Sequence, residues 1–502
     1  MHLIRLCLTI WTLISINAEA GVIPEYVLNT GNHYSANALQ SLDSWIEEHR
    51  IKAFNYAVDN IGPRAGPEVV PGTVVASPSR EYPNYFYQWI RDAGLTIHSL
   101  IDEYANGTTT DKYSLEDLEL IFANYIELSR QVQRTSNPSG TMYTGGLGEP
   151  KFEVDGSPFT GAWGRPQRDG PPIRALALMH YVDIIRSGKG DALADQLLDS
   201  IIDLLLPDLQ YTAETWGFNG FDLWEEVSGI HFFTASMQRQ ALLQGALVLS
   251  SSHPRIAAYL HAEAMTMGPL IRNFYDSRRG HLVETLYSSR SGLDAALFLA
   301  MNHAKQEGTT FSCASCEVLS TLMRYIKDNR ARYPVNFQRQ SPTSGVAVGR
   351  YPEDVYDGVG MSRGNPWFLA TAAMAEQMYN LVIVHEKEGS VIVPCRAVRD
   401  FYRELLVESS VDPDTVLPQS AEAYPVRIGP DSEAYDAIIR GLLKYGDSFI
   451  AVIRHHTDAE GRMSEQLDAV TGFQRGAHDL TWSYCAFLDA VRARAIAYSL
   501  TA

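Results

Sequence analysis

Apolar residues recur at intervals of three and four along most of the chain, whereas runs that alternate apolar and polar residues are short and few. The first spacing is typical of helices that bury one face, and the second is typical of half-buried strands. The pattern therefore predicts an all-α protein. No linker rich in serine, glycine or proline interrupts the pattern, so we expect a single folded domain.

One arrangement repeats six times along the chain: a loop rich in aromatic and charged residues runs directly into an apolar helix, and a more amphipathic helix usually follows. The six loops are expected at 85–92, 163–170, 221–226, 291–294, 350–367 and 463–482. Helices that are apolar on most sides belong inside a protein, and amphipathic helices cover them. The repeat thus predicts about twelve helices in two rings, with the loops at one end. A helical solenoid, whose loops face different directions, is the alternative.

The first twenty residues have the form of a targeting segment. Arg5 gives a positive charge near the start, an apolar stretch covers 6–16, and a small-residue site ends at Ala20. The apolar stretch is too short to span a bilayer, so we expect a cleaved signal peptide over 1–20 and a secreted protein. The cell exterior, the cell wall and a vacuole remain open as destinations. Residues 21–70 are expected to form an N-terminal extension packed on the rings that 71–502 form.

The chain has 502 residues and a net charge of −18. Phosphates of nucleic acids and anionic membranes select basic surfaces, so we expect neither nucleic acid nor, after signal cleavage, a membrane as partner. A neutral substrate such as a sugar polymer fits this charge. Cys313-Ala-Ser-Cys316 could be half of a zinc site, but no second Cys or His pair stands at metal spacing nearby. We expect no metal and no cofactor.

Two covalent features follow from short motifs. Cys313 and Cys316 are expected to form a local disulfide in an oxidising compartment. Asn106-Gly-Thr108 is an acceptor sequence for a glycan, so we predict glycosylation of Asn106. Asn137 is excluded because a proline follows it.

The six loops combine tryptophans, tyrosines, carboxylates and arginines. Aromatic rings stack on the apolar faces of sugars, and charged groups make strong hydrogen bonds to sugar hydroxyls. A single tryptophan is more often a core residue than a ligand platform. Their recurrence at equivalent positions favours a sugar site, and the five are Trp89, Trp163, Trp224, Trp367 and Trp482. Trp482 falls slightly inside its helix and remains a core candidate.

Hydrolysis of a glycosidic bond needs two carboxyl groups, one protonated to donate to the leaving oxygen and one ionised to activate water or attack directly. In Trp224-Glu225-Glu226 an indole and a second carboxylate would raise the pKa of the carboxyl between them, so we expect the acid here. The pattern does not decide between Glu225 and Glu226, and a solvated acidic pair at a helix start is the alternative. Glu465, between two polar residues, is one candidate for the ionised group, and its competitors are Asp92, Asp222, Glu353 and Asp354.

Long strings in the loops are more specific than single residues. They are Tyr85-Phe86-Tyr87-Gln88-Trp89-Ile90-Arg91-Asp92, Trp163-Gly164-Arg165-Pro166-Gln167-Arg168-Asp169-Gly170, Asp222-Leu223-Trp224-Glu225-Glu226, Gly349-Arg350-Tyr351-Pro352-Glu353-Asp354, Asn365-Pro366-Trp367-Phe368 and Met463-Ser464-Glu465-Gln466. In this order they resemble the fungal glucoamylases, glycoside hydrolase family fifteen, from about Gly72 to Ala497. The resemblance implies the family's six-hairpin (α/α)6 barrel as a single catalytic domain, in agreement with the two expected rings.

The resemblance also implies roles for the carboxyl groups. The first glutamate of the Trp-Glu-Glu motif is the family's general acid, hence Glu225, and the glutamate of Ser-Glu-Gln is the general base, hence Glu465. The family inverts, giving β-glucose, and its closed pocket admits only chain ends. We therefore expect release of glucose from the non-reducing ends of starch, dextrins and maltooligosaccharides, with α-1,6 links cut more slowly. A monomer is expected.

By the same resemblance, Arg91 and Asp92 hold the far hydroxyls of the terminal glucose. Tyr85 and Trp89 line the pocket, and Trp163 stacks on the sugar and supports the acid. The other predicted binding residues are Asp222, Leu223, Trp224, Glu226, Arg350 and Trp367. Of these, Glu226 and Arg350 are expected to bind the sugar on the leaving side.

The sequence departs from the family pattern in three ways. Phe159 and Phe221 stand where members often carry tyrosine, which removes hydroxyls near the acid. Most of the family's cysteine pairs are absent. We expect no starch-binding module beside the catalytic region, and therefore weak adsorption to raw starch. A same-fold enzyme for isomaltosaccharides, dextran or trehalose is the nearest alternative. A non-catalytic sugar-binding protein is the other, but its hallmark, the loss of either glutamate, is not present.

Overall fold

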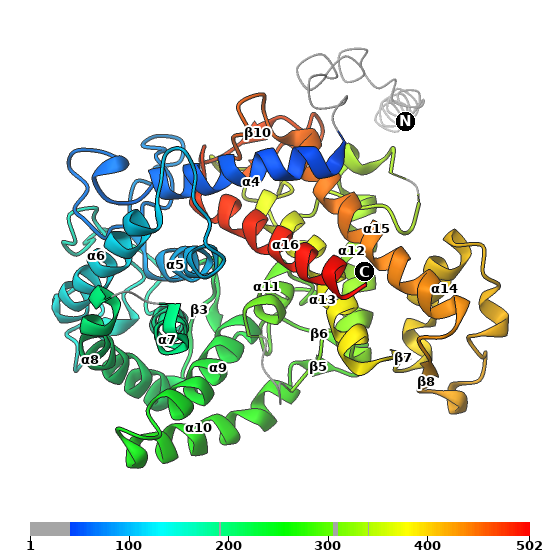
Figure 1. Cartoon of the computed structure of the whole chain (residues 1–502), viewed down its shortest axis with the longest axis horizontal. Helices are drawn as coiled ribbons and strands as arrows, with labels where there is room; N and C mark the ends of the chain where they lie inside the picture. The colour runs from blue at the N-terminus through cyan, green and yellow to red at the C-terminus, as the bar shows by residue number, and fades with distance from the viewer. Residues whose placement is uncertain (1–40, 190–191, 305–309, 340, 502) are drawn as a thin grey trace, which may run out of the picture.

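The computed structural model describes residues 41–501 except 190–191, 305–309 and 340. The predicted signal peptide and residues 21–40 of the predicted extension lie outside the described residues. The described chain is built from helices α4 to α16, with short two-stranded ribbons and turns between them (Figure 1). The prediction of an all-α fold is confirmed.

Six helices form a closed inner ring in which each packs against the next. They are α5 (Ile90–Ala105), α7 (Gly170–Ile184), α9 (Phe232–Val248), α11 (Ala295–His303), α13 (Phe368–Glu388) and α16 (Thr481–Leu500). Each one follows one of the six predicted loops. In α13 every residue from 368 to 382 is buried, as expected for a helix with other helices on all sides.

Amphipathic helices cover this ring from outside. They are α6 (Leu115–Arg134), α8 (Ala192–Thr215), α10 (Pro254–Arg272), α12 (Cys316–Arg332) and α15 (Glu433–His456). In α6 the buried residues Leu118, Ile121, Phe122 and Tyr125 recur at spacings of three and four, which gives the helix one inward face. Figure 1 shows α6 and α8 outside α5 and α7, and α10 along the lower edge beside α9.

The last inner helix, α16, has its outer neighbour at the other end of the sequence. Within the predicted N-terminal extension, α4 (Leu42–Asp59) packs along α16. The ring of Trp45 lies edge-on to Phe487, with 5.6 Å between centroids. Helix α14 (Arg399–Glu408) and the ribbon of β7 (Val391–Val393) and β8 (Val426–Ile428) form a projection at the right of Figure 1.

Four further antiparallel ribbons connect the helices. They are β1 (Gln88–Trp89) with β2 (Lys151–Phe152), β3 (Gly220–Phe221) with β4 (Ser228–Gly229), β5 (Tyr275–Asp276) with β6 (His281–Leu282), and β9 (Gln466–Leu467) with β10 (Gln474–Arg475). Three of them, β1/β2, β3/β4 and β9/β10, lie where inner helices begin. Their backbone hydrogen bonds fix the predicted loops in shape.

The structure corrects the predicted disulfide. Cys316, the first residue of α12, is bonded to Cys395, which follows β7, and the two lie 79 residues apart in the sequence. Cys313 instead lies buried in the main core. The start of α12 therefore directs Cys316 to a segment distant in sequence, and a local spacing of three residues does not reveal that contact.

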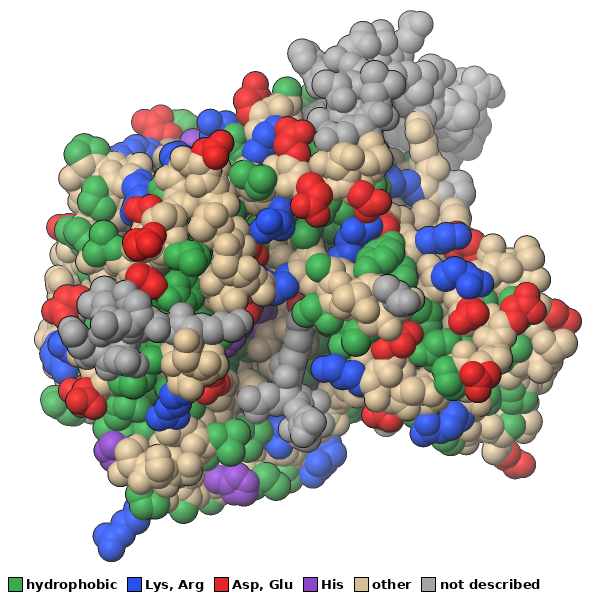
Figure 2. Space-filling view, viewed as in Figure 1, with side chains coloured by type: hydrophobic (Ala, Val, Ile, Leu, Met, Phe, Trp, Pro, Cys, Tyr) green, Lys and Arg blue, Asp and Glu red, His purple; other side chains and the backbone are tan. Residues whose placement is uncertain are grey.

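The surface is mixed in charge. Figure 2 shows Asp and Glu side chains interspersed with Lys and Arg over the visible face, so the negative charge is not gathered into one patch there. Among the described residues, no helix is long and apolar enough to cross a membrane.

Candidate active site

A cavity of about 350 Å³ opens at the end of the barrel where the inner helices begin. Its volume falls in the usual range for a small-ligand site. All predicted binding residues except Asp222 line it, as do Glu225 and Glu465. It is lined further by Ala76, Gly164, Tyr356, Met361, Leu480 and Trp482. Trp482 thus belongs to the cavity wall although it lies in α16.

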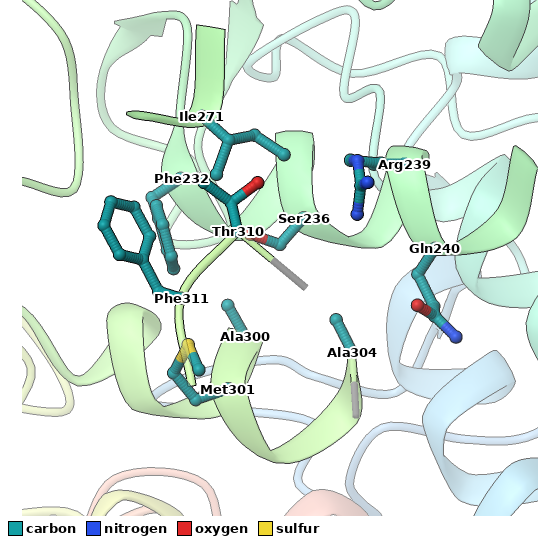
Figure 3. Close-up of a pocket in the computed structure, with 10 residues that line it drawn as sticks. All are labelled: Phe232, Ser236, Arg239, Gln240, Ile271, Ala300, Met301, Ala304, Thr310 and Phe311. Atoms are coloured by element: carbon teal, nitrogen blue, oxygen red, sulfur yellow. The ribbon is translucent and has the colours of Figure 1, made fainter. Parts of the chain in front are cut away.

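A second hollow does not compete for a sugar. It lies between α9 and α11, lined on its apolar side by Phe232, Ile271, Met301 and Phe311 (Figure 3). Its volume is about 30 Å³, enough for one or two water molecules.

Glu225 lies at the tip of the β3/β4 hairpin, with a φ of 67°. Residues other than glycine rarely adopt this left-handed conformation, so the hairpin must hold it in place. Asp222 does so: one carboxylate oxygen accepts from the backbone N–H groups of Glu226 and Val227, each at 2.7 Å. The prediction that Asp222 lines the binding site is therefore corrected, because its carboxylate shapes the loop beneath the cavity.

The side chain of Glu225 is held by residues far away in the sequence. Its Oε1 accepts from Trp89 Nε1 at 2.7 Å and from Gln167 Nε2 at 2.8 Å, and Arg91 Nη2 lies 3.7 Å away. The expected indole contact from Trp224 is wrong, since Trp224 Nε1 donates to Asp294 at 2.9 Å. An adjacent side chain in a tight hairpin points to a different side, so proximity in sequence misled the prediction.

Glu226, the second glutamate of the motif, has a different environment. It lies 2.8 Å from Nη2 of Arg350 and 2.8 Å from Nη2 of Arg290, and the Tyr351 hydroxyl donates to it. Burial alone would raise the pKa of Glu226, but these partners outweigh burial and lower it. Glu226 is therefore held in its ionised form and is unsuited to donate a proton. Of the two glutamates, Glu225 is the one that fits the acid.

Arg350 is fixed from several directions. Asp354 binds its guanidinium in a bidentate pair at 2.9 and 2.6 Å. Four aromatic rings surround the guanidinium at 5.2 to 5.3 Å, namely those of Trp224, Tyr351, Tyr356 and Trp367. Arg350 thus reaches the cavity with little freedom to move.

Three of the four competing candidates for the ionised group are engaged elsewhere or exposed. Asp222 accepts from the backbone of its own hairpin, and Asp354 binds Arg350. The exposed Glu353 accepts from the Ser291 backbone N–H at 2.7 Å. Asp92 does line the cavity, 3.6 Å from Arg91 Nε, and burial raises its pKa to about 6 despite the arginine.

Glu465 is fully buried from bulk solvent directly before β9, yet it lines the cavity. Its Oε1 accepts from the Tyr85 hydroxyl at 2.9 Å and its Oε2 from the Tyr356 hydroxyl at 3.3 Å. Burial raises the pKa of Glu465 to about 7, against the hydroxyl of Tyr85 and the charge of Arg350. The sequence neighbours do not supply this setting, since the Gln466 amide oxygen accepts from Asn365 at 2.8 Å.

Gly476 leaves room for the carboxylate of Glu465. It has a φ of +76°, and a Cβ added there would lie 2.2 Å from Glu465 Oε2. Only a glycine is compatible with this close approach of backbone to carboxylate.

One aromatic pair connects the two glutamates. Tyr85 bonds Glu465, Trp89 bonds Glu225, and their ring centroids lie 5.4 Å apart. Trp163 lies beside Trp89 at 6.1 Å and is 37% exposed, so it can offer a face to a ligand at the cavity rim. Two carboxyl groups are therefore presented to one aromatic-lined cavity, as the predicted chemistry requires.

The comparisons with known proteins agree with this geometry. Residues 52–492 match the family of glycosyl hydrolases 15. The chain belongs to glycosyl hydrolase family 15. A glucoamylase of Saccharomycopsis fibuligera is 36% identical over 482 residues, with 90% of each chain covered. An intracellular sporulation-specific glucoamylase of Saccharomyces cerevisiae is 34% identical, covering 90% of this chain and 84% of the relative.

Solved structures of family 15 share the fold. The Saccharomycopsis fibuligera glucoamylase superposes with a TM-score of 0.83 at 34% identity, covering 92% of this chain and 97% of that one. A family 15 glucoamylase from Hypocrea jecorina gives a TM-score of 0.79 at 33% identity, covering 91% and 72%. The predicted (α/α)6 barrel of family 15 is thereby confirmed.

Sequence reasoning missed two family 15 site residues. Gln167 donates to Glu225, and Tyr356 donates to Glu465. Both stand inside loops that were singled out, so their place in an aromatic and polar loop was a usable signal. Nothing in the sequence, however, indicated which carboxylate each would reach.

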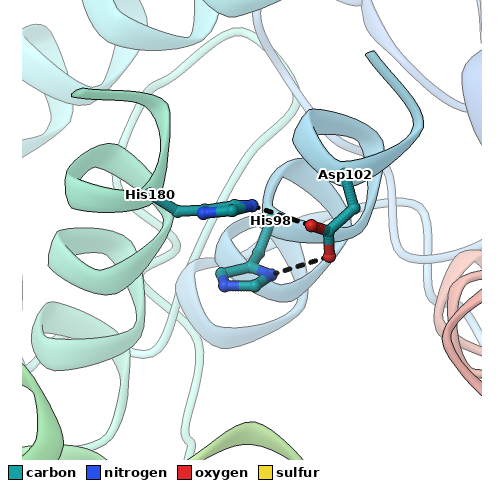
Figure 4. A group of neighbouring side chains, drawn as sticks. All are labelled: His98, Asp102 and His180. Carbon is teal, nitrogen blue, oxygen red and sulfur yellow. Dashed lines mark hydrogen bonds and ion pairs between the residues drawn. The ribbon is translucent and has the colours of Figure 1, made fainter. Parts of the chain in front are cut away.

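The group of His98, Asp102 and His180 is separate from this site (Figure 4). Asp102 lies ten residues beyond Asp92 along α5, about 15 Å deeper in the barrel. Its carboxylate is already paired with Arg492 at 2.8 Å and with His180 at 2.9 Å. The two imidazole rings stack at an interplanar angle of 17°, so the in-plane lone pairs of their nitrogens do not converge on one ion.

Proposed function

We propose that this chain is an exo-acting, inverting glucoamylase in which Glu225 is the general acid and Glu465 the general base. It releases β-glucose from the non-reducing ends of α-1,4-glucans and maltooligosaccharides. The observation that carries the proposal is the Tyr85–Trp89 pair, which ties each glutamate to the same cavity.

Glu225 is suited to give a proton to the glycosidic oxygen. Trp89 and Gln167 both donate to Oε1, which leaves Oε2 to carry the acidic hydrogen. As the bond between the anomeric carbon and that oxygen breaks, the proton passes to the leaving sugar and Glu225 becomes a carboxylate. Arg91, at 3.7 Å, favours the charge that develops.

Glu465 is suited to take a proton from water. The water attacks the anomeric carbon from the face opposite the leaving oxygen, which inverts the configuration. Tyr85 and Tyr356 hold the glutamate in position, and their hydroxyls favour its ionised form. The predicted distance between the two carboxyl groups, roughly 6.5–9.5 Å, leaves room for this water.

Arg91 and Asp92, both buried at the start of α5, suit the floor of a pocket that accepts only a chain end. Glu226 and Arg350 suit the sugar on the leaving side. Trp367 Nε1 is buried without a partner among the described residues, and it offers a donor for a sugar hydroxyl at the wall.

The deciding experiment follows maltose hydrolysis by proton NMR. Initial release of β-glucose is expected, whereas initial α-glucose would refute inversion. Glu225→Gln and Glu465→Gln should each lower kcat by roughly 100- to 10,000-fold while the fold survives. The exposed Glu422→Gln is the matched control, with unchanged turnover. Near-normal activity in either active-site variant would overturn the roles. Faster turnover of isomaltose or trehalose than of maltose would favour the same-fold alternative.

We further infer a secreted, monomeric and glycosylated enzyme. Asn106 supports the glycosylation, because it lies exposed at the C-terminal cap of α5, open to a glycan. The mature protein should begin at Gly21 and elute as a monomer in gel filtration. Asn106→Gln should remove the glycan shift in gel mobility. A protein retained in the cytosol with an intact N-terminus would contradict secretion.

A further inference from the structure

Lys151 is a buried lysine that the proposed mechanism does not use. It lies in β2 directly opposite Trp89 in β1, and only 2% of its surface is exposed. Opposed residues of an antiparallel pair project from the same face, so the ribbon delivers the lysine side chain beside the Trp89 indole.

Four aromatic rings enclose the ammonium group. Its Nζ lies 3.3 Å from the ring centroid of Trp163, 4.0 Å from that of Phe159, 4.3 Å from that of Tyr87 and 4.6 Å from that of Trp89. Each ring face carries partial negative charge and attracts a cation. Among the described residues, no carboxylate forms an ion pair or hydrogen bond with this ammonium.

The lysine remains charged where the enzyme would work. Burial lowers the pKa of Lys151 to about 8, so the ammonium persists at neutral and acidic pH. The charged groups that face it are Glu225, Glu153 and Glu149, which favour the ammonium, and Arg165, which opposes it.

The cage shares its walls with the support of the proposed acid. Trp89 donates to Glu225 at 2.7 Å, and Trp163 lies edge-on to Trp89 with 6.1 Å between centroids. The ammonium therefore lies behind the ring that bonds the acid, and it holds the ring exposed at the cavity rim. An apolar side chain in place of Lys151 would supply the packing but not the positive charge.

We propose that Lys151 is a positioning residue for the general acid: its caged ammonium locks Trp89 and Trp163 against Glu225 and stabilises the carboxylate formed when Glu225 gives up its proton. Lys151 neither gains nor loses a proton in the reaction. The proton moves from Glu225 to the glycosidic oxygen, and the fixed positive charge favours the ionised product of that transfer. In a partly buried site such an oriented charge acts more strongly than in water and needs no reorganisation.

The test compares Lys151→Met, which fills the cage without charge, with Lys151→Arg, which keeps the charge. Glu225 also faces Arg91 and Asp92, and both are unchanged in these variants. For Lys151→Met we expect kcat on maltose to fall roughly 3- to 10-fold, because the carboxylate that forms on Glu225 loses a stabilising positive charge. The alkaline limb of kcat/KM should move up by about one pH unit. Lys151→Arg should keep the alkaline limb of the wild type.

A second substrate separates charge from packing. α-Glucosyl fluoride has a leaving group that needs little protonation, so Lys151→Met should turn it over within about twofold of the wild-type rate. Equal losses on both substrates, or an alkaline limb that stays in place, would overturn the proposal. Should Lys151→Met fail to fold, Lys151→Arg alone decides. Arginine keeps the positive charge, so an upward move of the alkaline limb of kcat/KM in this variant would contradict the role of charge.

Because this role rests on the proposed role of Glu225, Glu225→Gln is measured in parallel. Full maltose activity in Glu225→Gln would refute the acid itself. An inactive Glu225→Gln beside an unshifted Lys151→Met would refute only the lysine. Lys52→Met is the matched control, because this partly exposed lysine on α4 is paired with Glu48. It should leave the acid and alkaline limbs of kcat/KM unchanged.

Discussion

At the scale of single residues, the two proposed catalytic glutamates differ in what surrounds their oxygens. Glu225 is held by nitrogen donors, from Trp89 and Gln167, and lies near a guanidinium. Glu465 is held by tyrosine hydroxyls in a fully buried position. Burial therefore dominates at Glu465, where it raises the pKa to about 7.

A pH dependence follows for the proposed base. Glu465 must be ionised to act as the proposed base, so kcat/KM on maltose should fall as the pH drops through the raised pKa near 7. The Tyr85 hydroxyl lowers that pKa, and Tyr85→Phe should move the acid limb to higher pH by about one unit. Tyr498→Phe is the matched control, because its hydroxyl donates to Asp447, remote from the cavity. An acid limb that stays or moves to lower pH would contradict the assignment.

At the scale of elements, short backbone pairings connect loops that come from different helices. A bridge between Gln167 and Phe221 joins the second loop to the third, and one between Trp367 and Gln466 joins the fifth to the sixth. Trp89 and Trp367 occupy the N-cap positions of α5 and α13, where extended backbone turns into helix. The rigid inner helices thus set the positions of side chains that the loops carry.

One buried ion pair connects an inner helix to its outer cover. Arg174 of α7 binds Asp208 of α8 in a bidentate pair at 2.7 and 2.6 Å, and both side chains are buried. Asp208→Ala leaves the guanidinium buried without its partner, so the free energy of unfolding should fall by about 3–5 kcal/mol. Urea denaturation measures this loss. Asp203→Ala, exposed on the same helix, should change stability by less than about 0.5 kcal/mol.

At the scale of the whole molecule, the disulfide closes a long loop. Cys316 and Cys395 are 79 residues apart, and the bond connects α12 to the segment after β7. Replacing both with serine should lower the free energy of unfolding by up to about 4 kcal/mol, because the unfolded chain regains conformational freedom. Thermal unfolding should show a lower Tm, and a reductant should lower the wild-type Tm but not that of the variant. Equal reductant sensitivity in both would contradict this pairing.

Local patterns in the sequence were enough for the helices and the loops. Hydrophobic spacing depends only on neighbouring turns of one helix, so α5, α7, α9, α11, α13 and α16 could be placed after their loops. Pro171 and Gly188 marked a helix between them, and α7 runs from Gly170 to Ile184 with Gly188 left-handed at a φ of 79°. The long loop strings carried the family resemblance for the same reason, because they are contiguous.

The tertiary structure decided every pairing across the barrel. Glu225 accepts hydrogen bonds from Trp89 and Gln167 and not from its sequence neighbours. Cys316 forms a disulfide with Cys395, and the ammonium group of Lys151 lies among four aromatic rings. Such contacts depend on how helices pack, and the side chain next in sequence usually points another way. The sequence by itself therefore determined which groups are present at the mouth of the barrel, and only packing determined which of them touch.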